Sequence, residues 1–291
     1  MARLIFFGTE DFSAISLQAL IDAGYDIAAV ITKPDSRSGR GQKLVAPAVK
    51  TIAESHDIAV WQPHKLSEIA EDLRALQPIA GVLVSYGKII PQSIIDLFTP
   101  GIINVHPSLL PKYRGPSPIE STIIHGDQTT GVSIMQLSAA MDAGPVYTQK
   151  VHELHGTETQ PELYQTLGQA GSRLLIESLP SILEDSLSPV PQNDADATYC
   201  QLLQKSDALL DPTSHTATEL ERKVRAHLSF PRSKLEFAGH TVIVTKASVA
   251  SSPKTPLDLK CRDDHFLRVE EVIAPSGKKM NAEAFIRGYA A

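Results

Sequence analysis

The chain has 291 residues, 42% of them hydrophobic and 21% charged, and a formal net charge of −6. This length allows one large hydrophobic core and a second, smaller one, and no apolar run reaches the roughly 18 residues of a membrane helix or forms a secretion signal. We therefore expect a two-domain protein in the cytoplasm, and since Cys200 and Cys261 are isolated, neither a disulfide framework nor a zinc site is indicated.

Residues 3–84 alternate between strand and helix patterns. Strands are predicted at 3–7, 27–31, 60–61 and 81–84, and helices at 13–23, 48–55 and 66–76. Strands that alternate with helices form a parallel sheet covered on both faces, so we predict a Rossmann-like α/β domain. The first turn, at Gly8, lacks the second and third glycines of a dinucleotide site, and no nucleotide cofactor is expected.

Residues 32–44 insert a basic, glycine-containing loop between the second strand and the next helix. Its basic residues are Lys33, Arg37, Arg40 and Lys43. The loop starts at the carboxyl end of a predicted strand, so these side chains could meet phosphates while the glycines permit close approach. An ordinary surface connector can have the same composition, and that alternative stays open.

Two polar side chains are predicted to share one face of a strand at 101–106. Asn104 and His106 stand two positions apart, and Pro107 ends the strand because it has no N–H to donate. Open α/β sheets keep their ligand crevices at the carboxyl ends of strands. A further strand at 131–137 ends shortly before Asp142, so the three polar groups are expected to converge.

An amide, an imidazole and a carboxylate are the groups needed to pass a one-carbon acyl unit to an amine. The reaction requires donors for the oxyanion of the tetrahedral intermediate and a base for the amine proton. Asn104 and a protonated His106 would donate, and Asp142 would hold the imidazole and take the proton, directly or through water. Alternatively, His106 is a satisfied buried histidine and Asn104 a turn residue.

The C-terminal part of the chain has its own pattern. A long helix is predicted near 161–184, followed by a polar, proline-containing linker. Strand-like runs at 235–237, 241–244 and 267–272 then predict a small, OB-like β-barrel. The predicted division is 1–186, a linker at 187–204, and 205–291. Residues 201–291 hold 14 Lys or Arg against 11 Asp or Glu, a net charge of +3 that leaves −9 for residues 1–200 and permits RNA binding.

The motif from Asn104 to Gly115, Asn-x-His-x-Ser-Leu-Leu-Pro-x-Tyr-Arg-Gly, together with Asp-x-Gly at Asp142, resembles the signature of the folate-dependent formyltransferases. The resemblance implies that Asn104, His106 and Asp142 are catalytic, that 10-formyltetrahydrofolate is the formyl donor, and that no metal is required. Residues 84–91 resemble the loop of this family that lines the folate pterin pocket. The residues thereby expected to bind the donor are Ser85, Tyr86, Gly87, Ile89, Ser108, Leu109, Leu110, Pro111 and Met141.

Members of this family differ in the amine that they formylate, and some only hydrolyse the donor. The loop at 33–43 and the residues from 205 onward resemble the branch that formylates methionyl-tRNA, which implies tRNA contacts by Lys33, Arg37, Arg40 and Lys43. Asn281 is expected to cap the last helix. We therefore predict a monomer, without membrane contact, that formylates charged initiator tRNA in translation initiation. An amino-sugar-nucleotide formyltransferase and a non-catalytic RNA- or folate-binding protein stay open as alternatives.

Overall fold

The computed structural model describes residues 3–38 and 42–289. The chain divides into two compact units, and each is described by itself below. The first unit comprises Met1–Pro116, Thr130–Glu153 and Tyr164–Tyr199, and the second comprises Ser117–Thr129, Leu154–Leu163 and Cys200–Ala291. Neither unit is one continuous stretch of sequence.

The first unit is built on a large sheet, which in the described part of the chain has seven strands in the order β5-β2-β1-β6-β7-β8-β9. The strands are β1 (Arg3–Gly8), β2 (Asp26–Ile31), β5 (Ala59–Trp61), β6 (Ala80–Val84), β7 (Ile102–His106), β8 (Thr129–Gln136) and β9 (Val146–Glu153). From β5 to β7 all pairs are parallel, which confirms the predicted Rossmann-like sheet. β8, by contrast, runs antiparallel to β7.

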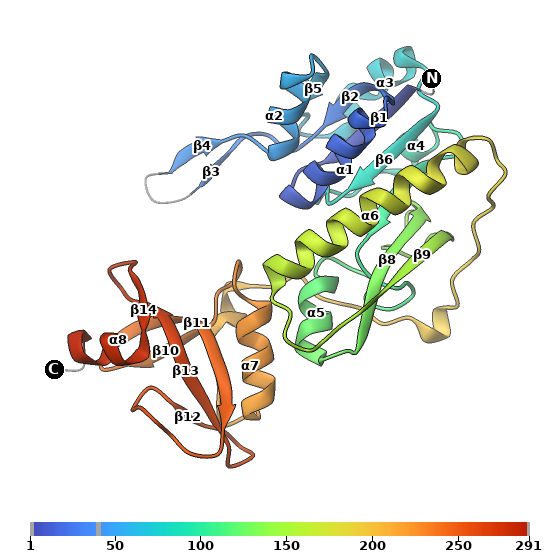
Figure 1. Ribbon diagram of the computed structural model, residues 1–291. Helices are drawn as coiled ribbons and strands as arrows, with labels where there is room; N and C mark the ends of the chain where they lie inside the picture. Colours follow the sequence, from blue (N-terminus) through green and yellow to red (C-terminus); the bar gives the residue numbers. More distant parts are fainter. Residues whose placement is uncertain (1–2, 39–41, 290–291) are drawn as a thin grey trace. The chain divides into compact units, whose positions relative to one another are not determined.

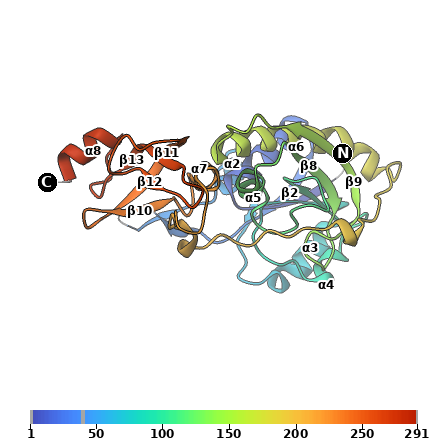
Figure 2. The same cartoon turned by 90° about the horizontal axis from the view of Figure 1, so that it is seen from below.

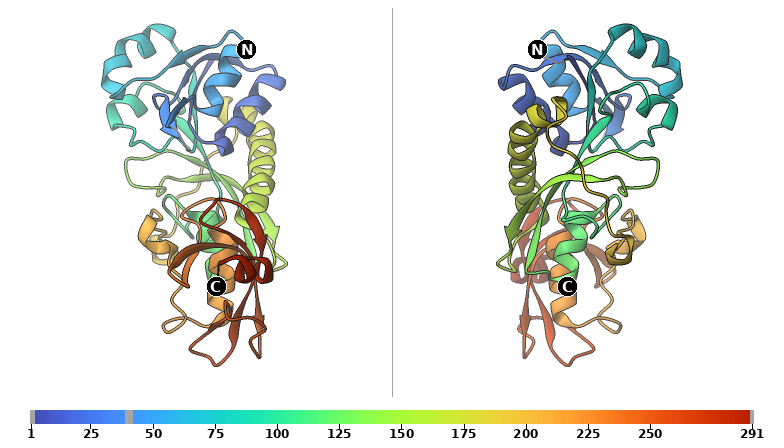
Figure 3. Two further views of the ribbon diagram at one scale, coloured as in Figure 1. Left: turned by 90° about the vertical axis from the view of Figure 1, so that its left-hand side faces the viewer. Right: turned by 90° about the vertical axis from the view of Figure 1, so that its right-hand side faces the viewer.

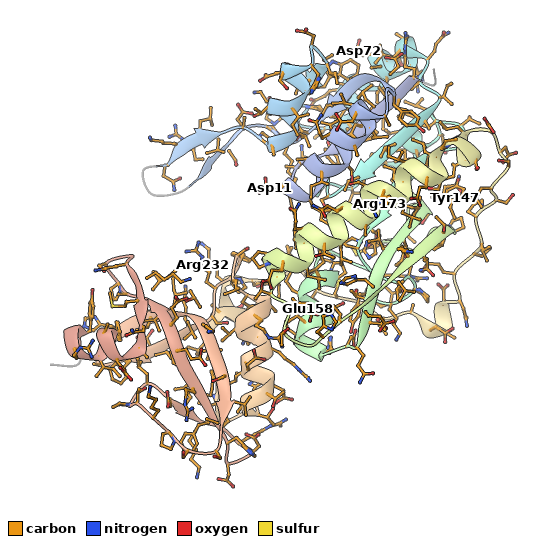
Figure 4. The ribbon with its side chains drawn as sticks, viewed as in Figure 1. Asp11, Asp72, Tyr147, Glu158, Arg173 and Arg232 are labelled. Carbon is orange, nitrogen blue, oxygen red and sulfur yellow. The ribbon has the colours of Figure 1, made fainter. Side chains whose placement is uncertain are left out.

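Helices cover both faces of this sheet, as predicted from the alternating pattern. Figures 2 and 3 show α1 (Asp11–Asp22), α2 (Ala48–Ser55) and α6 (Gln160–Leu183) on one face, with α3 (Ala70–Leu76) and α4 (Gln92–Ile95) on the other. α3 is preceded by a 3-10 turn, η1 (Leu66–Ile69). Asp11 lies in the first turn of α1 (Figure 4), where a carboxylate interacts favourably with the helix dipole.

The long helix α6 approaches α1 closely. The hydroxyl groups of Ser16 and Ser172 are 3.2 Å apart, and the rings of Phe12 and Tyr164 meet edge to face at 5.7 Å. A Cβ on Gly168 would overlap the Ile15 side chain. Small residues therefore allow α6 to pack against the helix that follows the first strand.

The direction of strand order reverses between β1 and β6. The chain builds β2 and β5 on one side of β1 and then returns to build β6 and β7 on the other side. The loops that follow the two strands are tied together, because the Thr9 hydroxyl donates to the Tyr86 carbonyl at 3.0 Å. Ligand sites of open α/β sheets lie at such reversal points, outside the carboxyl ends of the strands.

The basic segment after β2 is not an irregular loop. β3 (Ser36–Ser38) and β4 (Lys43–Val45) pair antiparallel as a small hairpin, which Figure 1 shows extending away from the large sheet. β4 is exposed along its length, so it has no buried face that would require apolar residues at alternate positions. Periodicity therefore gave no signal for the hairpin.

The second unit contains an antiparallel half-barrel, whose strands among the described residues follow the order β10-β11-β13-β12, with β14 also paired to β13. The elements are β10 (Lys234–Phe237), β11 (His240–Ala250), β12 (Leu259–Lys260), β13 (Phe266–Ile273), β14 (Lys279–Asn281), α5 (Pro118–His125), α7 (Ala217–Ala226), α8 (Ala282–Tyr289) and the 3-10 turn η3 (Lys205–Ala208). The three strands predicted here are confirmed, although β11 is longer than expected and irregular near Lys246.

Helices pack against this half-barrel and complete its core. α7 contacts β11 and also α5, which comes from much earlier in the chain, and α8 contacts β13. The predicted cap is confirmed, because the Asn281 side-chain oxygen accepts the Ala284 N–H at 2.8 Å. In the described residues of both units, no helix is long and apolar enough to span a membrane.

Candidate active site

The side chains of Asn104 and His106 are both buried on β7, each only 5% exposed. Nε2 of His106 lies 3.0 Å from the Tyr113 carbonyl oxygen. Because a carbonyl can only accept, Nε2 carries a proton in this arrangement, and Nδ1 is the nitrogen left to face other groups. The Asn104 amide makes no hydrogen bond with any other residue that the structure describes, so its donors are unused by the fold.

Asp142 lies beside the free side of this imidazole. Its Oδ2 is 3.8 Å from His106 Nδ1, which is too long for a direct hydrogen bond and leaves the imidazole anchored by Tyr113 instead. The same oxygen accepts the Gly115 N–H at 2.8 Å. Asp142 adopts a φ of 47°, a left-handed conformation that non-glycine residues rarely take.

The carboxylate reaches His106 by a route that the sequence did not indicate. Since β8 is antiparallel to β7, with His106 opposite Ser133, its carboxyl end lies beside the start of β7. The loop after β8 must therefore turn back to bring Asp142 to the imidazole. Gly144 belongs to this turn, and a Cβ there would overlap the Gln136 carbonyl oxygen.

The segment after His106 is held by hydrogen bonds to the buried Ser133 hydroxyl and to Gln149. The Ser133 hydroxyl donates to the Ser108 carbonyl at 2.6 Å and accepts the Leu110 N–H at 3.1 Å. Gln149 donates to both the Ser133 hydroxyl and the Leu110 carbonyl, each at 2.8 Å. Ser108 and Leu110 are buried, whereas Leu109 and Pro111 are half-buried. This network fixes the backbone that leads to Tyr113.

The predicted donor loop follows β6. Tyr86 is 1% exposed, its ring packs against Phe7, and burial raises its pKa to about 12. Only the backbone of Tyr86 is therefore available to a ligand. Ser85 and Gly87 both have positive φ, while the Ile89 side chain is 88% exposed, as is 62% of Met141 on the loop that carries Asp142.

Of the four basic residues of the segment after β2, the structure describes three, and Lys33 lies apart from the other two. Arg37 and Lys43 are exposed on opposite strands of the β3–β4 hairpin. Lys33 lies at the carboxyl end of β2 instead, with its ammonium group so close to Gly87 that a Cβ there would overlap it. Arg40 is outside the described residues.

A polar network anchors the base of this hairpin. Lys50 Nζ donates to both carboxylate oxygens of Asp35, at 3.0 and 2.9 Å, and to the Gln62 side-chain oxygen. Gln62 in turn donates to Asp35 and to the Lys33 carbonyl, each at 2.8 Å. The bonds from Gln62 and Lys50 lower the pKa of Asp35. The hairpin therefore starts from a fixed point on the sheet.

Metal ligands do not gather in the described residues: no group of three or more His, Cys, Asp and Glu side chains could hold an ion there. Cys200 and Cys261 are both buried and are not joined in a disulfide.

Several polar contacts of the site were not predicted from the sequence. Two of them are backbone groups, the Tyr113 carbonyl and the Gly115 N–H, within the motif itself. Ser133 and Gln149 support the motif from neighbouring strands. Gln192, in the predicted linker, donates to the carbonyl groups of Asp142 and Gly144.

Comparison with known proteins agrees with this geometry. The model of the family "Formyl transferase" matches residues 2–179, and that of "Formyl transferase, C-terminal domain" matches residues 202–290. The chain belongs to the formyl transferase family. Among its relatives is the methionyl-tRNA formyltransferase of Halorhodospira halophila, 41% identical over 247 residues that cover 84% of this chain and 79% of the relative.

Solved structures show the same fold at low sequence identity. HypX from Aquifex aeolicus superposes with a TM-score of 0.69 and 15% identity over 99% of this chain, which spans 49% of that larger protein. The N-formyltransferase from Helicobacter canadensis, in complex with folinic acid and dTDP-3-aminofucose, gives a TM-score of 0.68 and 19% identity over 96% of this chain and all of that one (100%). Both units of the chain therefore have counterparts in known structures.

Proposed function

We propose that this protein transfers the formyl group of 10-formyltetrahydrofolate to the α-amine of methionyl-initiator-tRNA, releasing tetrahydrofolate and formyl-methionyl-tRNA. The observation that carries the proposal is the approach of His106 and Asp142 to 3.8 Å, with Asn104 on the same strand as the imidazole. The chain's similarity to methionyl-tRNA formyltransferases supports the choice of acceptor.

In the proposed reaction the amine nitrogen attacks the formyl carbon and a tetrahedral oxyanion forms. The unused Asn104 amide donates to that oxyanion, and His106, when doubly protonated, donates through Nδ1, since Nε2 is held by Tyr113. Asp142 receives the proton from the attacking nitrogen. The C–N bond to the folate then breaks, and the donor nitrogen takes up a proton as it leaves.

The donor is proposed to bind beside the loop that follows β6. A flat heterocycle suits apolar side chains combined with backbone hydrogen bonds at its edge. The exposed side chains of Ile89 and Met141 and the backbone groups of Ser85 and Gly87 are proposed to supply them. The remaining residues that we propose for this site are Ser108, Leu109, Leu110 and Pro111, which continue from His106.

For the acceptor, the β3–β4 hairpin is proposed to contact tRNA phosphates. Arg37 and Lys43 are exposed on it, and the Asp35–Lys50–Gln62 network holds its base. Arg40 is proposed to act with them, although it lies outside the described residues. Lys33 contributes from the sheet edge beside Gly87, and the part of the chain from residue 205 binds the tRNA body.

We further propose that the protein acts as a monomer in the cytoplasm, where charged tRNA is available. In this proposal residues 1–186 carry the chemistry, and residues 187–204 connect them to the tRNA-binding part at 205–291. Gel filtration with light scattering tests the monomer. A stable dimer of about 63 kDa, twice the chain mass of 31.5 kDa, would contradict it.

The decisive experiment measures transfer of radiolabelled formyl from 10-formyltetrahydrofolate. Charged initiator tRNA and an amino-sugar nucleotide serve as separate acceptors, with a control that has no acceptor. We expect label in methionyl-tRNA alone. Label in the sugar nucleotide would overturn the acceptor assignment, formate release without an acceptor would indicate a hydrolase, and no turnover would favour a binding protein.

A further inference from the structure

The Gln192 side chain connects two segments of the candidate active site: the loop that carries Asp142 and the segment around Arg114. It lies in residues 184–199, which Figure 2 shows passing from the end of α6 to the opposite face of the large sheet. Its Nε2 donates to the carbonyl oxygens of Asp142 at 2.8 Å and Gly144 at 2.7 Å. Its Oε1 accepts from Arg114 Nε at 3.0 Å and Nη2 at 2.9 Å.

These four contacts fix the orientation of the Gln192 amide. A reversed amide would set its oxygen against two carbonyl oxygens and its NH₂ group against a guanidinium, so all four contacts would become repulsive. The amide therefore fits this place in one orientation only. Every one of its polar atoms is used in joining the Asp142 loop to Arg114.

Arg114 is the other half of the connection. It is only 2% exposed, and it also donates to Asp194 at 2.8 Å and to the Tyr199 hydroxyl at 3.3 Å. Its chain neighbours make the polar contacts of the site: the Tyr113 carbonyl holds His106, and the Gly115 N–H binds the Asp142 carboxylate. A guanidinium held on several sides keeps both neighbours in place.

The segment that supplies Gln192 is itself fixed to the first unit. Val190 and Val146 exchange two backbone hydrogen bonds of 2.8 Å, and Thr198 pairs with Pro111 and Arg114 through its backbone. The segment was expected to be a linker. Besides the connecting role proposed for it, its contacts hold it across the candidate site.

We propose that Gln192 is a positioning residue for the carboxylate of Asp142. Asp142 has a left-handed backbone, so its place depends on the hydrogen bonds to its carbonyl and carboxylate groups, from Gln192 and Gly115 respectively. Gln192 does not reach the reacting atoms. It acts through the loop, by keeping the carboxylate at its distance from His106. The inference rests on the proposed formyl transfer.

Two variants separate this role from a general one in folding. Gln192→Glu keeps the acceptor for Arg114 but replaces the NH₂ group with an oxygen that repels the Asp142 and Gly144 carbonyls. Gln192→Ala removes all four contacts. Gln169→Ala, an exposed glutamine on α6, is the matched control. Steady-state formyl transfer to tRNA, the pH profile of kcat and thermal unfolding are measured for each.

We expect both Gln192 variants to lower kcat by about 10²-fold, the effect of misplacing a catalytic group by about 1 Å. KM for tRNA should change less than about twofold, because the β3–β4 hairpin is not touched by Gln192. The pH profile of kcat should change shape, and Gln169→Ala should match the wild type. Gln192→Glu with unchanged kcat and pH profile overturns the inference, as does activity lost only in proportion to the unfolded fraction.

A double variant gives an independent check. If Arg114 and Gln192 act through one connection, Arg114→Lys combined with Gln192→Ala should lose no more activity than the more damaging single change. Multiplicative losses would contradict a shared role. Failure of the proposed function would look different, since the wild type itself would then transfer no formyl group to tRNA.

Discussion

Asn104 is buried on β7, and its side-chain amide makes no hydrogen bond within the described residues. We predict that Asn104→Ala lowers kcat for formyl transfer by about 10²- to 10³-fold, the usual effect of removing one oxyanion donor. KM should change little, because the amide would act on the transition state rather than on the bound substrates. Thermal unfolding checks that the variant is folded. A loss below about tenfold would exclude an oxyanion role.

A second prediction for a single residue concerns His227 and the pH dependence of folding stability. It is 1% exposed, neither ring nitrogen has a partner in the described residues, and burial lowers its pKa to about 4. Below pH 6.5, the ordinary pKa of histidine, His227 binds a proton in the unfolded chain but stays neutral in the folded protein. Stability should therefore fall as the pH drops from 6.5 towards 4, by on the order of 3 kcal/mol in total.

Thermal unfolding at pH 7.5 and 5.0 measures this dependence. In His227→Leu the difference between the two pH values should shrink, because the buried titrating group is gone. His56→Gln, a change at an exposed histidine, should keep the wild-type difference. Equal pH dependence in the His227 variant and the wild type would mean that other groups control acid stability.

At the scale of elements, the β3–β4 hairpin is the part with the clearest expected role in tRNA affinity. We predict that the double change Arg37→Ala and Lys43→Ala raises KM for tRNA and reduces the slope of log affinity against log salt by roughly 1 to 2, since each phosphate contact contributes about 0.9. The transfer assay at several salt concentrations measures both. An unaltered slope would show that these side chains do not contact phosphates.

The base of the hairpin gives a separate prediction. Asp35→Asn breaks the charge pair with Lys50, which joins the hairpin to α2. The hairpin should become less ordered before binding, and KM for tRNA should rise by roughly threefold to tenfold, the effect of losing one typical hydrogen bond. The kcat should stay near the wild-type value, because no reacting group moves. A large fall in kcat at unchanged KM would contradict an anchoring role.

Helices and strands with a strong local pattern could be predicted from the sequence. The direction of a strand in the sheet, and the strand with which it pairs, could not. The strands from Arg3 to Val84 were recognised because they are short apolar runs between helical segments. Periodicity does not encode whether β8 runs parallel or antiparallel to β7, and the exposed hairpin has no apolar face. In the site, side-chain chemistry singled out His106 and Asp142. Gln192 gave no signal, because it meets Arg114 from 78 residues away.

For the whole molecule, the division into units predicts that truncation after Tyr199 leaves an incompletely folded fragment. A fragment of residues 1–199 retains α5 but lacks α7, its packing partner. It also lacks Ser229, which donates to Gln160, and Arg222, which donates to the His125 carbonyl. We predict that the fragment binds a hydrophobic dye and unfolds at lower temperature than the full chain. A fragment with native unfolding behaviour would contradict this.

The discontinuous second unit also sets an order of events during synthesis. α5 leaves the ribosome about 100 residues before α7, and at roughly 5 to 20 residues per second it waits some 5 to 20 seconds for its partner. Throughout that interval the surface of α5 that packs against α7 stays uncovered. The nascent chain therefore holds an incompletely packed helix until α7 has emerged.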